Sequence, residues 1–571
     1  MTTFLAIALL VAPAAQRLRA ISEGYWQHEL ERDVGLRVKY GLPVERLPEV
    51  SERDEEAEAA FARQVLERLR DLEGEPLPPE DALTRDILRW KAGNTAGAAR
   101  FYWLAFPVTP YSSPLTAVNR VFTTFRFQQP ADFDRYLSLL AAYPAFVDQM
   151  RAKLEGQRMR GILLPKDEID LVIPFLAAAG KRGDESALFV KSDRLAALDR
   201  EAARSFQDRL RAAVDTKVAP AFDRLQALLG PDYRAQAPAA VGLGQYPGGK
   251  DAYRFLVRFH TTMEVSPEEV HRTGLEEVAS LDARMKQVRD SLGFRGDKAE
   301  FHRFLKTDPR FFAKTPEEVG ERLRAAVRAI EPRLDAFFLR RPKAPYDVRR
   351  LDPALEGSMT YGYYQVPTAA DPKGYYNYNG SNLSDRSLVN AAALAYHELV
   401  PGHHFQINLQ SENEALPSFR RESYDTAFTE GWGTYSADLA EEMGLYRDPY
   451  DLYGRLLMDM FLATRLVVDT GMNDLGWPRE RAIAFMKENT QESDLQIGTE
   501  TLRYSVDMPG QALAYRMGAR RLLELRERAR KALGGRFDIR RFHDAVLGSG
   551  SMPMAVLERR VDRFIEDERA R

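Results

Sequence analysis

The residues best suited to chemistry are three histidines within one span of eight residues: His397, His403 and His404. His397 is followed directly by Glu398, which reproduces the first half of the zinc-binding pattern H-E-x-x-H. In that pattern two histidines one helical turn apart bind one zinc ion, and the glutamate activates a metal-bound water. Position 401, where the second histidine would stand, is proline, so the strict pattern fails.

The spacing of the remaining histidines needs a local change in the backbone. On an ideal helix His403 would point about 240° away from His397, and His404 would lie about 10.5 Å farther along the axis. Pro401 cannot donate to the helical ladder and Gly402 tolerates unusual backbone angles, so together they predict a bulge that turns the next histidine back. We expect His403 to be the second ligand, with His404 as the alternative. Without a metal, the same residues would be a histidine-rich helix end favoured by the helix dipole.

A catalytic zinc normally takes three protein ligands and leaves one position for water. The third ligand could be one of four downstream glutamates: Glu412, Glu414, Glu422 or Glu430. Glu430 is favoured because it leads a segment with apolar residues at helical spacing. A carboxylate on such a face is costly to bury unless it is paired or bound to a metal. The alternative is a solvated glutamate at a helix end.

The elements that must position these residues are helices almost everywhere from about residue 50. Ser266-Pro267-Glu268-Glu269 and Thr315-Pro316-Glu317-Glu318 each combine a hydroxyl N-cap, a proline and a glutamate three residues after the cap. Ser358 to Asp385 breaks the pattern, because its Tyr, Gly, Asn and Pro suit short strands and turns. We predict a large, mostly α fold with a small β segment beside the active-site helix, and a soft boundary between two lobes near residue 260.

The composition excludes several classes of protein. The 571 residues are 44% hydrophobic, and Lys+Arg 81 against Asp+Glu 84 gives a formal charge of −3. The apolar fraction excludes a disordered chain, and the balanced charge offers no basic field for nucleic acid. Because the chain has no cysteine, a disulfide scaffold, a thiol nucleophile and a cysteine-ligated zinc are also excluded. No run reaches the roughly 18 apolar residues of a membrane helix.

The N-terminus has the pattern of an export signal. Phe4 to Val11 is an apolar run of eight residues, followed by Ala12-Pro13-Ala14, a small-residue cleavage site. The run predicts a signal peptide over residues 1–14 and a secreted or periplasmic helical domain over residues 15–571. A positively charged leading segment is missing, so the alternative is an apolar start on a cytoplasmic protein.

These residues resemble a known family. The segment from Tyr396 to His403, together with Thr429-Glu430-Gly431-Trp432, is similar to the bacterial family called domain of unknown function 885. That family is grouped with the gluzincin-type metallopeptidases and is mostly helical. Further matching blocks are Arg465–Gly471, Arg503-Tyr504 and Pro509–Tyr515, and the likeness runs from residue 24 to residue 565.

The resemblance implies roles for particular residues. His397, His403 and Glu430 would bind one zinc ion per chain, and Glu398 would be the general base. The chain departs from the family pattern at Asn473, where a histidine is usual. If that histidine helps to bind the transition state, activity in this chain would be weaker or differently tuned.

Together these features favour an exported zinc-dependent peptidase that cleaves small peptides. Glu398 would take a proton from the attacking water and pass it to the leaving amine. The developing oxyanion needs a further donor. Candidate donors are Tyr504 and Tyr515, and candidate substrate-binding residues are Arg503, Arg516 and Gln511. The segment from Tyr361 to Tyr378 could offer an edge strand to an extended peptide.

Two other functions fit parts of the sequence. The first is a non-catalytic exported binding protein with a degenerate zinc site, which Asn473 favours. The intact His397-Glu398 pair argues against it, because a structural zinc site needs no general base. The second is a helical scaffold without metal, which leaves the histidine cluster unexplained. The oligomeric state is not indicated by the sequence.

Overall fold

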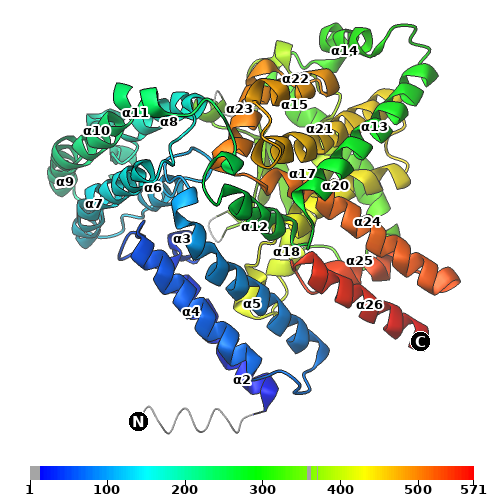
Figure 1. The fold of residues 1–571 in the computed structure, drawn as a ribbon, viewed down its shortest axis with the longest axis horizontal. Helices are drawn as coiled ribbons and strands as arrows, with labels where there is room; N and C mark the ends of the chain where they lie inside the picture. Colours follow the sequence, from blue (N-terminus) through cyan, green and yellow to red (C-terminus); the bar gives the residue numbers. More distant parts are fainter. Residues whose placement is uncertain (1–12, 357–361, 369–370) are drawn as a thin grey trace.

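The computed structural model describes residues 13–356, 362–368 and 371–571. The chain is mostly helical, as the hydrophobic periodicity predicts (Figure 1). Most of the proposed signal peptide, residues 1–12, lies outside the described residues. Among the residues that are described, no helix combines the length and apolar character needed to cross a membrane.

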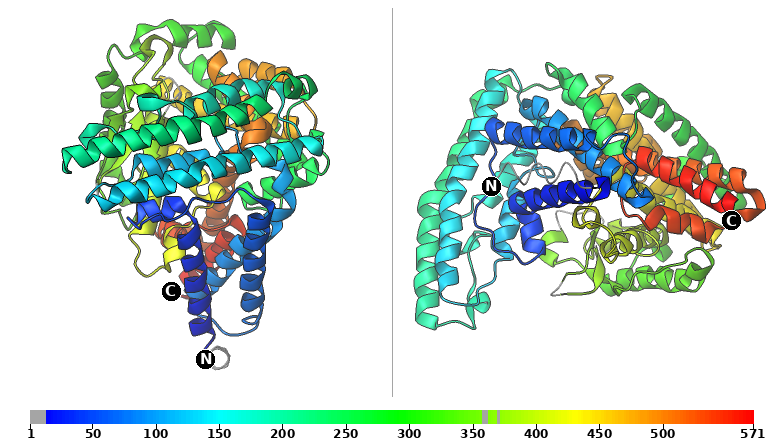
Figure 2. Two further views of the ribbon diagram at one scale, coloured as in Figure 1. Left: turned by 90° about the vertical axis from the view of Figure 1, so that its left-hand side faces the viewer. Right: turned by 90° about the horizontal axis from the view of Figure 1, so that it is seen from below.

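One group of helices forms a lobe with its own apolar core. It lies at the left of Figure 1, and Figure 2 (left) shows its long helices side by side. The core contains large buried side chains such as Phe122, Tyr136 and Phe206. The helices are α6 (Leu115–Thr123), α7 (Ala131–Met159), α8 (Lys166–Ala179), α9 (Arg200–Ala213), α10 (Ala219–Leu228) and α11 (Pro231–Gln236).

The N-terminal helices pack with the C-terminal half of the chain. These are α2 (Ala14–Arg32), α4 (Glu52–Arg70) and α5 (Pro79–Ala98), while the short α3 (Val34–Lys39) contacts the first lobe. Their buried residues share one apolar cluster with residues 313–565. The proposed boundary near residue 260 falls at the end of α12 (Gly249–Thr261), but α2, α4 and α5, which all precede it, belong with the later core.

The second half supplies the helices around the histidines. They are α13 (Pro267–Ser291), α14 (Lys298–Thr307), α15 (Pro316–Ile330), α16 (Pro353–Glu356), α17 (Ala391–Glu398), α18 (His403–Ser411), α19 (Ser418–Arg421), α20 (Thr426–Glu442), α21 (Pro449–Asn473), α22 (Arg479–Asn489), α23 (Asp494–Leu502), α24 (Ala514–Leu533), α25 (Ile539–Leu547) and α26 (Met554–Ala570). The two predicted helix starts are confirmed. Ser266 and Glu269 form a reciprocal capping box, and the Thr315 hydroxyl accepts a hydrogen bond from the Glu318 backbone N–H.

A small sheet lies beside these helices. Its strands are β1 (Tyr346–Arg350), β2 (Gly362–Gln365) and β3 (Gly374–Tyr378), in the order β1-β3-β2. β1 pairs parallel with β3, and β2 pairs antiparallel with β3, so β2 is an edge strand. β2 and β3 confirm the predicted β segment. β1 lies upstream of that segment and was not predicted.

Helices α20 and α24 approach each other backbone to backbone. A Cβ atom at Gly518 would lie 2.0 Å from the carbonyl oxygen of Ala427, and one at Gly431 would lie 2.6 Å from the backbone of Gly518. Only glycine fits such an approach, because the obstructing atoms are backbone atoms that cannot turn away. This contact fixes the position of α20, which carries Glu430.

We expect Gly518→Ala to lower the free energy of unfolding by about 1–3 kcal/mol or more, because overpacking forces the two helices apart. Urea unfolding measures the change. Gly24→Ala in α2 is the matched control, since a Cβ atom there meets nothing within 4 Å. Alanine is the better helix former, so the control should be unchanged or more stable. Equal stability of the two variants would contradict the close approach.

Candidate metal centre

The histidine motif spans a break between two helices. α17 ends at Glu398 and α18 begins at His403, with a cis peptide bond between Val400 and Pro401. The predicted bulge within one helix is therefore wrong: the helix ends and a second one starts. A Cβ atom at Gly402 would lie 1.8 Å from the carbonyl oxygen of His397, so only glycine permits this path. The break still turns His403 back toward His397, which is the effect that the bulge was expected to have.

Four of the predicted residues meet at this break. Glu430 Oε2 lies 3.3 Å from His403 Nε2 and 3.7 Å from His397 Nε2. The ligand atoms of His397, Glu398 and His403 all lie within 4.8 Å of one another. His397, His403 and Glu430 are buried. Gly433 makes room for the first ring, since a Cβ atom there would lie 2.8 Å from the His397 imidazole.

The spacing of these atoms fits a tetrahedral metal. Two ligands bound at about 2.0–2.1 Å in a tetrahedral arrangement lie about 3.3–3.4 Å apart. The two histidine–glutamate distances, 3.3 and 3.7 Å, are close to that value. The imidazole rings are nearly perpendicular, at 83°, with centroids 4.7 Å apart. Two imidazole nitrogens and one carboxylate oxygen form a ligand set that zinc accepts in catalytic sites.

The two glutamates of the centre have different pKa values. Burial raises the pKa of Glu430, but hydrogen bonds and charge from His397 and His403 outweigh it and hold the pKa well below the ordinary range. Burial raises the pKa of Glu398 to about 7, against lowering by His403 and by a hydrogen bond from the backbone of Tyr364. Glu430 is therefore a carboxylate ready to bind a cation, and Glu398 can exchange a proton near neutral pH.

His404 points away from the cluster. Its Nε2 donates a hydrogen bond to the carbonyl of Ala344 at 3.0 Å, so its Nδ1 accepts one from the Tyr364 hydroxyl at 2.8 Å. Asn408 Nδ2 donates to the same hydroxyl at 2.9 Å. Burial lowers the pKa of His404 to about 4, which keeps the ring neutral. Both ring nitrogens are occupied, and the ring attaches the edge strand β2 to helix α18.

The two candidate tyrosines lie at different depths. The Tyr515 ring is parallel to the His397 ring within 14°, with centroids 6.2 Å apart. Burial and the charge of Glu430 raise the pKa of Tyr515. Tyr504 is fully buried, and its hydroxyl accepts a hydrogen bond from Arg465 Nε at 2.8 Å. Of the two, Tyr515 is the one beside the cluster.

The candidate substrate-binding residues separate into two places. Arg503 donates hydrogen bonds to Gln511 and to the side chain of Tyr515, so these two residues are linked to the cluster. Arg516 lies in a separate charge network with Glu277, Asp438 and Asp459, at 2.6, 3.6 and 3.5 Å. Asn473 is also engaged elsewhere: its amide bonds to the backbone of Asp469, Tyr504 and Leu243.

Two contacts of the centre were not anticipated from the sequence. The Tyr424 hydroxyl donates a hydrogen bond to Glu430 Oε1 at 2.8 Å, although the residue is 53% exposed. Tyr424 belongs to no motif, and nothing in the sequence signals it. The backbone contact from Tyr364 to Glu398 comes from the segment expected to form strands, but its partner could not be read from the chain.

The chain was compared with known proteins. A family model described as "Bacterial protein of unknown function (DUF885)" matches residues 33–561. A crystal structure described as a "putative lipoprotein" from Colwellia psychrerythraea has 26% identity and a TM-score of 0.89, covering 98% of this chain and all of that one. A "putative lipoprotein of unknown function" from Shewanella oneidensis has 17% identity and a TM-score of 0.74, covering 96% and 99%. No curated protein matches the chain in sequence.

We expect His397→Ala, His403→Ala and Glu430→Ala each to lose bound zinc, because each removes one of three converging ligand atoms. Zinc per chain, measured by mass spectrometry after dialysis against micromolar zinc, checks this. Tyr515→Phe is the matched control, since only its ring lies against His397 and its zinc content should be normal. Full zinc occupancy in Glu430→Ala would exclude that carboxylate as a ligand.

We expect His404→Ala to retain zinc while β2 becomes less protected, because the variant removes one hydrogen bond to Tyr364 in β2 and one to Ala344 just before β1. Leaving Tyr364 and Ala344 without these partners should cost about 1–3 kcal/mol in unfolding free energy. Hydrogen exchange of residues 362–365, with zinc content on the same preparation, measures both effects. Loss of zinc with unchanged exchange would make His404 a ligand.

Proposed function

The chain belongs to the DUF885 family of bacterial proteins of unknown function, and from that premise we propose that it is a zinc-dependent, gluzincin-type peptidase that hydrolyses small peptides. The observation that carries the proposal is the convergence of His397, His403 and Glu430 at near-tetrahedral spacing beside Glu398. A purely structural zinc site would not need a fourth, protonatable side chain at its edge.

The roles in hydrolysis follow from the placement of the side chains. A zinc ion held by His397, His403 and Glu430 would polarise the scissile carbonyl and make water more acidic. Glu398, with a pKa of about 7, would accept the proton of the attacking water and return it to the leaving amine.

Tyr515 is the favoured donor to the developing oxyanion. Its ring lies against His397, and its raised pKa keeps the hydroxyl protonated at neutral pH. Preorganised donors of this kind contribute strongly to acyl-transfer catalysis. Tyr504, which is held by Arg465, is the second candidate. Arg503 and Gln511 are proposed to bind polar or carboxylate groups of the substrate, whereas Arg516 has a structural role in its own ion-pair network.

The edge strand β2 supports an extended peptide as substrate. Among the described residues β2 pairs with β3 and with no second strand, so a further strand could add along its other edge. The backbone of Tyr364 in β2 lies at hydrogen-bonding distance from Glu398. A peptide added along β2 would therefore pass next to the proposed general base.

We also propose that the protein is exported. The similar structures from Colwellia psychrerythraea and Shewanella oneidensis are described as lipoproteins, which supports a location outside the cytoplasm. The apolar run from Phe4 to Val11 supports a signal peptide over residues 1–14. The alternative of a non-catalytic binding protein rests on Asn473, whose amide is used in packing contacts between three segments.

The general base can be tested separately from metal binding. Glu398→Gln keeps the shape of the side chain but cannot accept a proton at neutral pH. We expect near-normal zinc content and peptide cleavage reduced by about 10²-fold or more. A peptide library incubated with the zinc-loaded protein and read by mass spectrometry gives the cleavage rate.

Glu414→Gln is the matched control, because Glu414 is exposed and should leave cleavage unchanged. Unchanged cleavage in Glu398→Gln would remove Glu398 from the mechanism, and lost zinc would make it a ligand. Absence of cleavage by the zinc-loaded wild type across the library would overturn the proposed peptidase.

A further inference from the structure

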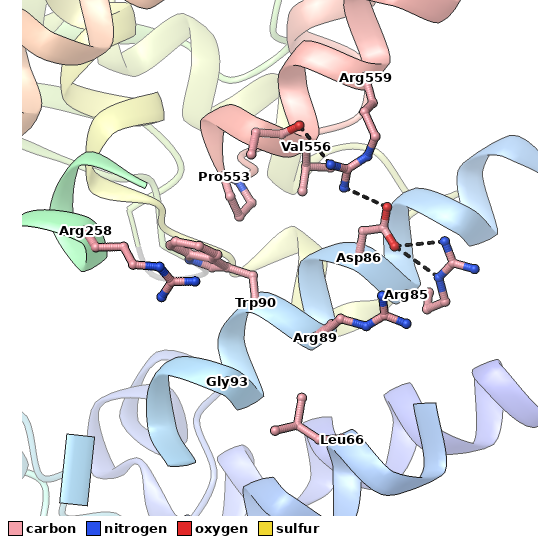
Figure 3. A pocket seen from close by; sticks show the side chains of 11 residues that line it. Leu66, Arg85, Asp86, Arg89, Trp90, Gly93, Arg258, Pro553, Val556 and Arg559 are labelled. Carbon is pink, nitrogen blue, oxygen red and sulfur yellow. Dashed lines mark hydrogen bonds and ion pairs between the residues drawn. The ribbon is translucent and has the colours of Figure 1, made fainter. Parts of the chain in front are cut away.

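A second feature of the molecule is a cavity that shares no residue with the metal centre. It has a volume of about 480 Å³ and lies between α5, α12 and α26 (Figure 3). Its charged lining residues are Arg85, Asp86, Arg89, Arg258 and Arg559. Four arginines and one aspartate give a formal charge of +3, although the whole chain carries −3. The positive charge is therefore concentrated at this place.

The five charged groups differ in their ion-pair partners. Asp86 pairs with Arg85 at 2.9 Å and with Arg559 at 2.7 Å, so the single acidic group of the cavity is already shared. Arg89 and Arg258 pair instead with glutamates that do not line the cavity.

The two glutamates that pair with Arg89 and Arg258 form only weak ion pairs. The side chains of Glu73 and Glu264 are 58% and 77% exposed. Exposed ion pairs of this kind contribute about 0–1 kcal/mol, because water screens them. Arg89 and Arg258 can therefore exchange these glutamates for an anionic ligand at little cost.

The guanidinium groups stand at different ends of the cavity. Figure 3 shows Arg258 at one end, Arg89 and Arg559 toward the other, and Trp90 between them. Arg258 lies over the Trp90 ring at 4.3 Å and donates a hydrogen bond to Asn94, which fixes its direction. Leu66, Pro553 and Val556 add apolar surface along the wall.

We propose that this cavity binds a small ligand with two anionic groups, carboxylates or phosphates, separated by a short apolar portion. Guanidinium groups bind both kinds of anion through paired, charge-assisted hydrogen bonds. The two ends of the cavity each supply such a group, and Trp90 with the apolar wall contacts the middle of the ligand. This inference does not rest on the proposed peptidase function.

A neighbouring cavity has a smaller excess of positive charge than the first one, which favours the first cavity as the anion site. It has a volume of about 1170 Å³ and shares Gly93 and Arg258 with the smaller cavity. Its other charged lining residues are Arg100, Arg254, Asp251 and Glu264, which balance one another. The excess of positive charge is thus on the side of Arg89 and Arg559.

Isothermal titration calorimetry of the full chain tests the site, with propane-1,3-bisphosphonate and glutarate as probes in a low-salt, phosphate-free buffer; each has two anionic groups joined by three methylene groups. We expect saturable binding of at least one probe with one site per chain. Arg89→Gln and Arg258→Gln should each weaken it about tenfold or more, because each removes a charge-assisted pair. Arg563→Gln is the matched control, since Arg563 lies on α26, is exposed and pairs with Asp567 on the same helix.

The outcomes separate the possible ligands. Binding of the bisphosphonate alone indicates phosphate-type groups, and binding of glutarate alone indicates carboxylates. Acetate, with one anionic group, should bind at least tenfold more weakly than glutarate if carboxylates are preferred. Absence of saturable binding by both probes would overturn the proposal. So would equal affinity in Arg89→Gln, Arg258→Gln and the control, because the anion would then be held elsewhere, for example at the metal centre.

Discussion

The structure around the site depends on one buried carboxylate held between two imidazoles. Glu430 lies 3.3 and 3.7 Å from the Nε2 atoms of His403 and His397. A buried charge is stable only if it is paired, so the three side chains must stay together. They come from α20, α18 and α17, and this requirement fixes three helices relative to one another. The close packing of α20 on α24 at Gly431 and Gly518 fixes the helix that carries this carboxylate.

Features of the site that depend on local sequence could be predicted, and features that depend on contacts in space could not. His397, Glu398, His403 and Glu430 follow from residue type and motif, and the helix starts at Ser266 and Thr315 follow from capping chemistry. The helix break could not be predicted in form, because it depends on Gly402 meeting the carbonyl oxygen of His397 in space. Arg516 could not be separated from Arg503, since its partner Glu277 is 239 residues away in the chain. Tyr424 and β1 likewise depend on contacts that no local pattern records.

Neighbouring histidines at the start of α18 have divided roles. Adjacent residues on a helix point about 100° apart, so His403 and His404 face different partners. His403 faces Glu430, while His404 holds Tyr364 of β2. One helical turn thus positions both the proposed metal and the edge strand that would carry a peptide. A shift of α18 would move the two together, which preserves their relative position.

The environment also gives the two glutamates of the centre opposite properties. Glu430 lies 3.3 and 3.7 Å from two histidines, which lower its pKa and stabilise its ionised form, and it accepts a hydrogen bond from Tyr424. Glu398 is half-buried and its neighbours offset its desolvation less, so its pKa rises to about 7. Pairs of titratable groups whose surroundings separate their pKa values are the usual basis for distinct roles in one active site. The division between a permanently charged ligand and a proton-exchanging base therefore follows from the local contacts of each carboxylate, before any substrate is considered.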